Sequence, residues 1–240
     1  MEKVVKKPYT SNLEEQYEVK FSEHCIFTTL TSNTVVVDKW ISEIQSIYDQ
    51  GTIVGLDTEW CLPQKKKKCG PVAILQLCVG TRCLIFQLIL AETIPESLKE
   101  FLADATLKFV GVGVGGDAQK LLKEYGLCVG HTEDLAVVAA MKLEEEKLKE
   151  AGLKKLADLI LGVDMQKPKK VILSCWDAKV LDLKQIHDAC VDAFVSFEIR
   201  NVSLDLKLAA GFRSLPFSNE LDCGYSLGGN SWGCSMGTTF

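Results

Sequence analysis

The chain has 240 residues, of which 47% are hydrophobic and 25% are charged, a composition typical of a folded globular protein. Its 27 basic and 32 acidic residues give a net charge of −5, which excludes a polycation that coats nucleic acid by bulk charge. Any contact with nucleic acid must therefore use a local basic patch, or metal ions that offset the charge of carboxylates.

The sequence gives no sign of export or of membrane insertion. The first ten residues, MEKVVKKPYT, contain no apolar stretch, so a secretory signal is not expected. No run approaches the ~20 apolar residues of a membrane helix. The ten cysteines include no CxxC pair and are accompanied by only three histidines, so we interpret them as free, mostly buried thiols. These features predict a protein of the nucleus or the cytoplasm, with no membrane partner.

Runs of β-branched, aromatic and apolar residues predict the strands, and apolar residues three to four positions apart predict the helices. In chain order, the first half is expected to form strands at 17–21 and 25–31, a helix from Ser32 or Asn33 to Gly51, and strands at 52–57, 72–79 and 83–87. The second half is expected to form a helix at 95–103, a strand at 108–112, helices at 117–125, 135–149 and 153–161, a basic loop at 167–170 and a long helix at 183–202.

An antiparallel meander followed by alternating strands and helices predicts an α/β fold, with a mixed sheet and helices on both of its faces. Residues 17–207 are expected to form the folded domain. Residues 1–16 are polar and are expected to be a flexible N-terminus. Residues 208–240 are rich in glycine and serine and are expected to be a flexible tail.

Asp57 and Glu59 form the first candidate site. They end an apolar run, and residues two apart on a strand point to the same side. Two carboxylates placed in this way repel each other unless a cation neutralises them, and their hard oxygen atoms suit Mg²⁺ or Mn²⁺. A strand end with two solvated acids is the alternative.

Asp117 follows a glycine-rich turn and opens the helix predicted at 117–125. An acid in the first turn of a helix also stabilises the helix dipole, so this position alone does not indicate a site. Gly111, Gly113 and Gly116 match the dinucleotide-binding pattern GxGxxG, which leaves a nucleotide cofactor as an alternative. A dinucleotide site is expected to open a first βαβ unit, however, and here a three-strand meander precedes the glycines.

Asp188 and Asp192 lie four residues apart on the long predicted helix and so share one of its faces. For this pair alone, the solvated face of an amphipathic helix is the simpler interpretation. Together with the pair on the strand and the acid at position 117, however, carboxylates from three segments can hold two metal ions. Two such ions activate water and stabilise the leaving oxygen in phosphodiester hydrolysis.

These motifs together resemble the DEDD superfamily of 3′→5′ exonucleases, which has an RNase H-like fold, and within it the plant branch of Werner-syndrome-type exonuclease domains. The matching segments are IVGLDTEW (53–60), VAILQLCVG (72–80), FVGVGVGGDAQKL (109–121), LKKLADLILG (153–162), SCWDAKVL (174–181) and QIHDACVDAF (185–194). The resemblance implies two Mg²⁺ or Mn²⁺ ions, with Asp57, Glu59, Asp117 and Asp192 as the ligands.

The resemblance also implies a residue that orients the attacking water, either a tyrosine four positions before the last aspartate or a histidine five positions before it. In this chain Asp188 occupies the tyrosine position, and His187 lies five positions before Asp192. Histidine suits a base at neutral pH, but on a regular helix a five-residue step rotates by about 140°, away from the metals. His187 and Asp188 therefore remain competing candidates.

The candidate substrate-binding residues are Trp60 and the run Lys65, Lys66, Lys67 and Lys68. The tryptophan directly follows the acidic pair and can stack on a base, although packing in the core is an equal alternative. The lysines fall in the loop after the acidic strand, where they either contact phosphates or form a solvated turn.

The sequence thus predicts a Mg²⁺- or Mn²⁺-dependent 3′→5′ exonuclease that acts on the 3′ ends of single-stranded DNA or RNA, or on overhangs, and releases 5′-nucleotides. Because Asp188 stands where a tyrosine is expected, a second hypothesis is a catalytically weak or inactive nucleic-acid-binding or scaffold module that retains the fold. A second copy of the chain is a further candidate partner, in a homo-oligomer.

Overall fold

A computed structural model describes residues 3–7, 14–47, 51–61, 70–166 and 168–205, all within one compact unit. Its strands are β1 (Lys3–Lys6), β2 (Glu15–Phe21), β3 (His24–Thr31), β4 (Ile53–Trp60), β5 (Val72–Val79), β6 (Arg82–Phe86), β7 (Lys108–Gly111) and β8 (Thr132–Asp134). Its α-helices are α1 (Thr34–Ile47), α2 (Glu96–Ala103), α3 (Val114–Tyr125), α4 (Leu135–Lys142), α5 (Leu153–Leu156), α6 (Lys169–Ile172) and α7 (Leu183–Asp205). Short 3₁₀ and π turns are η1 (Leu88–Leu90), η2 (Glu146–Glu150) and η3 (Ala157–Leu161).

Within these residues the strands form one mixed sheet, in the order β1-β2-β3-β6-β5-β4-β7-β8. β4, β5 and β6 pair antiparallel and form the predicted meander. β3 pairs in parallel with β6, and β7 pairs in parallel with β4 and β8. The predicted mixed α/β sheet is therefore confirmed.

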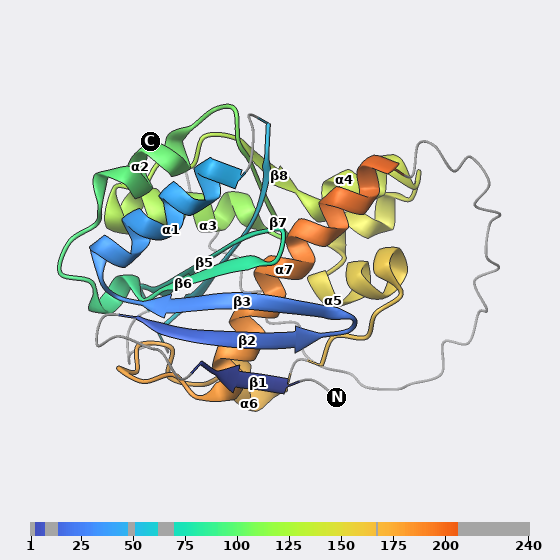
Figure 1. Cartoon of the computed structure of the whole chain (residues 1–240). Helices are drawn as coiled ribbons and strands as arrows, with labels where there is room; N and C mark the ends of the chain where they lie inside the picture. Colours follow the sequence, from blue (N-terminus) through green and yellow to red (C-terminus); the bar gives the residue numbers. More distant parts are fainter. Residues whose placement is uncertain (1–2, 8–13, 48–50, 62–69, 167, 206–240) are drawn as a thin grey trace. The chain divides into compact units, whose positions relative to one another are not determined.

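Helices cover both faces of the sheet, as predicted (Figure 1). On one face, apolar side chains of α1, α2 and α3 pack against alternate residues of β4 and β5, among them Leu56, Leu75 and Leu77. On the other face, α4, α5 and α7 pack against Ile74 and Cys78 and their neighbours on the adjacent strands. The central strands are thus buried on both sides, which explains their nearly continuous apolar sequence.

β1 lies within the segment 1–16 that we expected to be flexible. It pairs antiparallel with β2, which itself begins at Glu15. The expectation of flexibility is therefore wrong for Lys3–Lys6. A short edge strand with exposed lysines carries little apolar pattern, so no local pattern predicts it.

Two helix predictions also need correction. The helix expected at 135–149 is broken, because α4 ends at Lys142 and Glu144 adopts a left-handed φ of 55° before η2 begins. A left-handed residue cannot continue a right-handed helix. The basic loop expected at 167–170 instead contains the first residues of α6, which begins at Lys169.

α7 crosses the sheet and is buried on every side over residues 185–196. A solvated helix face is therefore wrong for Asp188 and Asp192, which are only 9% and 2% exposed. In the described ranges, none of the helices is both long enough and apolar enough to span a bilayer. The predictions for Lys65, Lys66, Lys67 and Lys68 and for residues 208–240 lie outside the described residues and stay predictions.

Candidate active site

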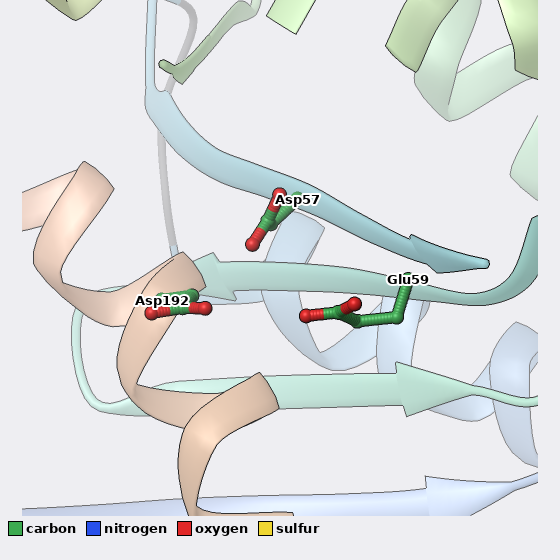
Figure 2. A group of neighbouring side chains, drawn as sticks. All are labelled: Asp57, Glu59 and Asp192. Atoms are coloured by element: carbon green, nitrogen blue, oxygen red, sulfur yellow. The ribbon is translucent and has the colours of Figure 1, made fainter. Parts of the chain in front are cut away.

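Three of the predicted carboxylates meet where α7 passes over β4. Ligand oxygens of Asp57, Glu59 and Asp192 all lie within 4.8 Å of one another. Figure 2 shows the first two side chains leaving β4 on the same side and turning toward the third, which projects from α7. The first two are half-buried, and Asp192 is almost fully buried. Residues 135 positions apart in the sequence therefore form one acidic group.

A glycine on β4 permits this meeting. A Cβ atom at Gly55 would lie 1.9 Å from the backbone oxygen of Ala193, because the backbone of α7 rests directly on the strand at this point. Gly55 shares a strand face with Asp57, and Ala193 follows Asp192 in the helix. The absence of a side chain at residue 55 thus sets the distance between the acids of β4 and the acid of α7.

Asp117 lies beside this group rather than within it. It projects from the first turn of α3, and its carboxylate is not within 4.8 Å of all three others. Thr58 connects the two parts: its hydroxyl donates to Oδ1 of Asp117 at 2.6 Å, while its backbone N–H donates to Oδ1 of Asp57 at 2.9 Å. The structure therefore brings three predicted acids together and attaches the fourth through the residue between Asp57 and Glu59.

The environment of Asp117 shifts its protonation. Burial raises the pKa of its carboxyl group to about 6, although the hydroxyl group of Thr58 and the positive charge of Lys120 act to lower the pKa. A carboxyl group that resists ionisation in this way becomes a better anionic ligand when a cation arrives to compensate its charge.

The glycines around Asp117 have local structural uses. Gly111 lies so close to β4 that a Cβ atom would stand 2.5 Å from the backbone oxygen of Leu56. Gly113 precedes α3 with a left-handed φ of 73°. Close packing and a tight turn account for these two residues of the GxGxxG match.

The two candidates for orienting water lie near the start of α7. The helix is regular from Leu183, so Asp188 lies about one turn before Asp192 on the same side, and His187 is rotated away. Both residues are 9% exposed, and Nδ1 of His187 lies 3.4 Å from Oδ1 of Asp188. The irregular backbone that would favour His187 is not found, and the geometry favours Asp188.

Trp60 ends β4 on the same side of the strand as Thr58, and it is 37% exposed. Its Nε1–H donates a 3.0 Å hydrogen bond to the hydroxyl of Thr58, and Nζ of Lys120 lies 3.4 Å from the ring centroid. Packing in the core is therefore not its role. The ring is held in place by the same threonine that contacts Asp57 and Asp117.

Sequence reasoning missed three residues that build this site: Gly55, Thr58 and Lys120. Each lies one or two positions from a residue that was recognised, or one turn along the same helix, so proximity to the motifs was the available signal. Their roles depend on contacts between distant segments, which spacing within one segment does not reveal. The arrangement as a whole offers oxygen ligands of the kind that bind divalent cations such as Mg²⁺ and Mn²⁺.

Comparison with known proteins gives consistent results. A family model described as 3′-5′ exonuclease matches residues 32–208. A 3′-5′ exonuclease of Arabidopsis thaliana is 34% identical over 155 residues, which cover 64% of this chain and 53% of the relative. The bifunctional 3′-5′ exonuclease/ATP-dependent helicase WRN of Mus musculus is 32% identical over 161 residues, which cover 65% of this chain and 11% of that protein. The chain thus spans about half or less of the length of these relatives.

A solved structure supports the fold. The exoribonuclease RNase D of Escherichia coli superposes with a TM-score of 0.63 at 16% identity, covering 75% of this chain and 45% of that chain. At this identity the similarity shows the architecture alone.

Proposed function

Since the chain belongs to the family of DEDD-type 3′-5′ exonuclease domains, we propose that it hydrolyses the terminal phosphodiester bond at the 3′ end of single-stranded nucleic acid or of an overhang. The observation that carries this proposal is the mutual approach of Asp57, Glu59 and Asp192 within 4.8 Å. Three carboxylates so close together repel one another strongly unless a cation is bound, and one of them is almost fully buried. Relatedness to the Werner-type branch is part of the proposal.

The donor set fits Mg²⁺ or Mn²⁺. Asp57, Glu59 and Asp192 would hold one ion, and Asp117 would supply a further carboxylate toward a second. Two bound ions would supply an activated water and stabilise the leaving 3′-oxygen, and the product would be a 5′-nucleotide. Divalent-cation dependence is therefore an integral part of the proposed activity.

The remaining residues position the reactants. Asp188, on the same side of α7 as Asp192, would accept a hydrogen bond from the attacking water, with His187 beside it. Trp60 would stack on a base near the 3′ end. Lys65, Lys66, Lys67 and Lys68 would contact phosphates upstream.

The proposal is tested with 5′-labelled single-stranded DNA and RNA oligonucleotides incubated with the full chain and Mg²⁺ or Mn²⁺. A ladder that shortens from the 3′ end is expected for the wild type and is expected to be lost in Asp57→Asn. The surface variant Asp158→Asn, whose carboxylate lies on the exposed side of η3, serves as a matched control and should retain the ladder. If the wild type and Asp57→Asn gave the same ladder, the acidic group would be excluded as the active site.

A second candidate is a nucleic-acid-binding module with little or no catalysis. Asp188 in the position where the family has a tyrosine favours it. In that case the wild type retards the labelled oligonucleotide in a gel without shortening it. Turnover at ordinary enzyme rates would exclude this alternative.

A further inference from the structure

Gln76 is a polar residue in the middle of β5, a strand in which all eight residues are buried. Its exposed fraction is 0%. Neither Oε1 nor Nε2 has a hydrogen-bond partner among the residues that the structure describes. A buried amide without partners costs desolvation free energy that an apolar residue of the same size would not, so such a group needs an explanation.

The register of the sheet places Gln76 next to the acidic group. It lies directly opposite Asp57 in the antiparallel pairing of β4 and β5, so the two side chains leave the same face of the sheet. Its neighbours on that face of β5, Ile74 and Cys78, pack in the core beneath α7. Gln76 therefore projects toward the face that carries Asp57, Glu59 and Asp192.

The chemistry of the amide complements that of the acids. Carboxylates only accept hydrogen bonds, while a glutamine amide offers two N–H donors and an accepting oxygen. Water bound to a divalent cation, in turn, is a strong donor. A cation held by the three acids would thus bring to Gln76 the partners that the protein itself does not supply.

We propose that Gln76 is a positioning residue of the metal centre: once a cation is bound, its Oε1 accepts a hydrogen bond from a metal-bound water and its Nε2 donates one to the carboxylate of Asp57, which lies opposite it on β4. This inference rests on the proposed function and deepens it. Groups that orient metal ligands in this way typically contribute a factor of about 10 to 100 to metal affinity.

The test compares Gln76→Met, which keeps the length of the side chain and removes the amide, with Gln87→Met. Gln87 is similarly buried, but its Nε2 already donates to the backbone oxygen of Ala178. Calorimetric titration with Mn²⁺ alone should show affinity about 10- to 100-fold weaker for Gln76→Met. Gln87→Met should bind Mn²⁺ as the wild type does.

Urea denaturation in EDTA supplies the second readout. Without metal, Gln76→Met should be at least as stable as the wild type, because it removes an unpaired buried amide, whereas Gln87→Met should be less stable. If Gln76 served only the stability of the fold, Gln76→Met would be less stable than the wild type in EDTA and would bind Mn²⁺ with unchanged affinity.

The results that would overturn the inference on Gln76 differ from the result that would overturn the proposed function. If the wild type binds Mn²⁺ and Gln76→Met binds it within twofold, or if Gln76→Met is less stable in EDTA, the inference is overturned while the proposed function stands. If the wild type itself binds no Mn²⁺, the proposed function fails, and the inference fails with it.

Discussion

The hydroxyl group of Thr58 donates a 2.6 Å hydrogen bond to Oδ1 of Asp117, across 59 positions of the sequence. Since the backbone N–H of Thr58 also donates to Asp57, one residue fixes acids that belong to a strand and a helix. Thr58 and Asp57 point to opposite sides of β4, so the fourth acid approaches from the α3 side while Asp192 approaches from the α7 side. The strand therefore serves as the common support of the site.

The buried state of Asp117 predicts a specific pH dependence of stability in the metal-free protein. The pKa of its carboxyl group rises from 3.8 to about 6 on folding, so the folded state retains a proton that the unfolded chain releases. This stabilising contribution is complete below pH 3.8 and is lost as the pH rises through about 6. Asp117→Asn, which cannot ionise, should raise the free energy of unfolding by about 2 to 3 kcal/mol at pH 8 and barely change it at pH 4.

Urea denaturation in EDTA at both pH values measures this effect. Asp158→Asn, on an exposed side chain, is the control and should show no comparable difference between pH 4 and pH 8. If Asp117→Asn changed the free energy of unfolding equally at the two pH values, burial would not raise the pKa of Asp117 as stated.

Gly55→Ala should separate α7 from β4. The new methyl group would meet the backbone oxygen of Ala193, so we expect a loss of about 2 to 4 kcal/mol in the free energy of unfolding, together with loss of Mn²⁺ binding. Gly115→Ala is the matched control, because its Cβ atom meets nothing within 4 Å and alanine favours the helix by about 0.5 to 1 kcal/mol. Chemical denaturation distinguishes the two, and a Gly55→Ala protein as stable as the wild type would show that the close approach is unnecessary.

Trp60→Ala should weaken binding of the oligonucleotide more than it slows the reaction. Loss of one stacking platform corresponds to about 1 to 3 kcal/mol, or roughly a 5- to 150-fold rise in KM. Trp60→Phe keeps an aromatic ring but loses the hydrogen bond to Thr58, so its KM should lie between those of the wild type and Trp60→Ala. Steady-state kinetics measure this, and equal KM values for Trp60→Ala and the wild type would leave the ring without a role in substrate binding.

The regular geometry of α7 predicts which of its polar residues orients water. Asp188→Asn should lower kcat by about 10²-fold or more, as expected for loss of a general base, and His187→Gln should lower it by a smaller factor. Single-turnover kinetics with both variants provide the comparison. The opposite ranking would mean that His187 reaches around the helix.

Much of the fold follows from local patterns. The strand at 72–79 has the observed bounds, and the meander of β4, β5 and β6 follows from three apolar runs in succession. The order of the sheet does not follow, because the parallel pairing of β3 with β6 joins segments separated by a helix and two strands. The break at Glu144 was likewise hidden, since the residues on both sides of it favour helix.

The acids of the site were recognisable, and the residues that assemble them were not. Asp57 and Glu59 stand out because two charges end an apolar strand. The role of Gly55 can be recognised only in the structure, where the backbone of Ala193 lies against it. Nothing in the sequence between the two residues indicates that contact. Gln76 offered a weak signal, a polar residue inside an apolar run, but its importance depends on the register that places it opposite Asp57.

The anomalous scattering of Mn²⁺, measured on crystals of the full chain grown with that ion, tests the proposed metal site most directly. We predict a peak among the carboxylates of Asp57, Glu59 and Asp192, and its disappearance in Asp192→Asn crystals. A wild-type map with no peak at these three side chains, or with the same peak in the variant, would contradict this prediction.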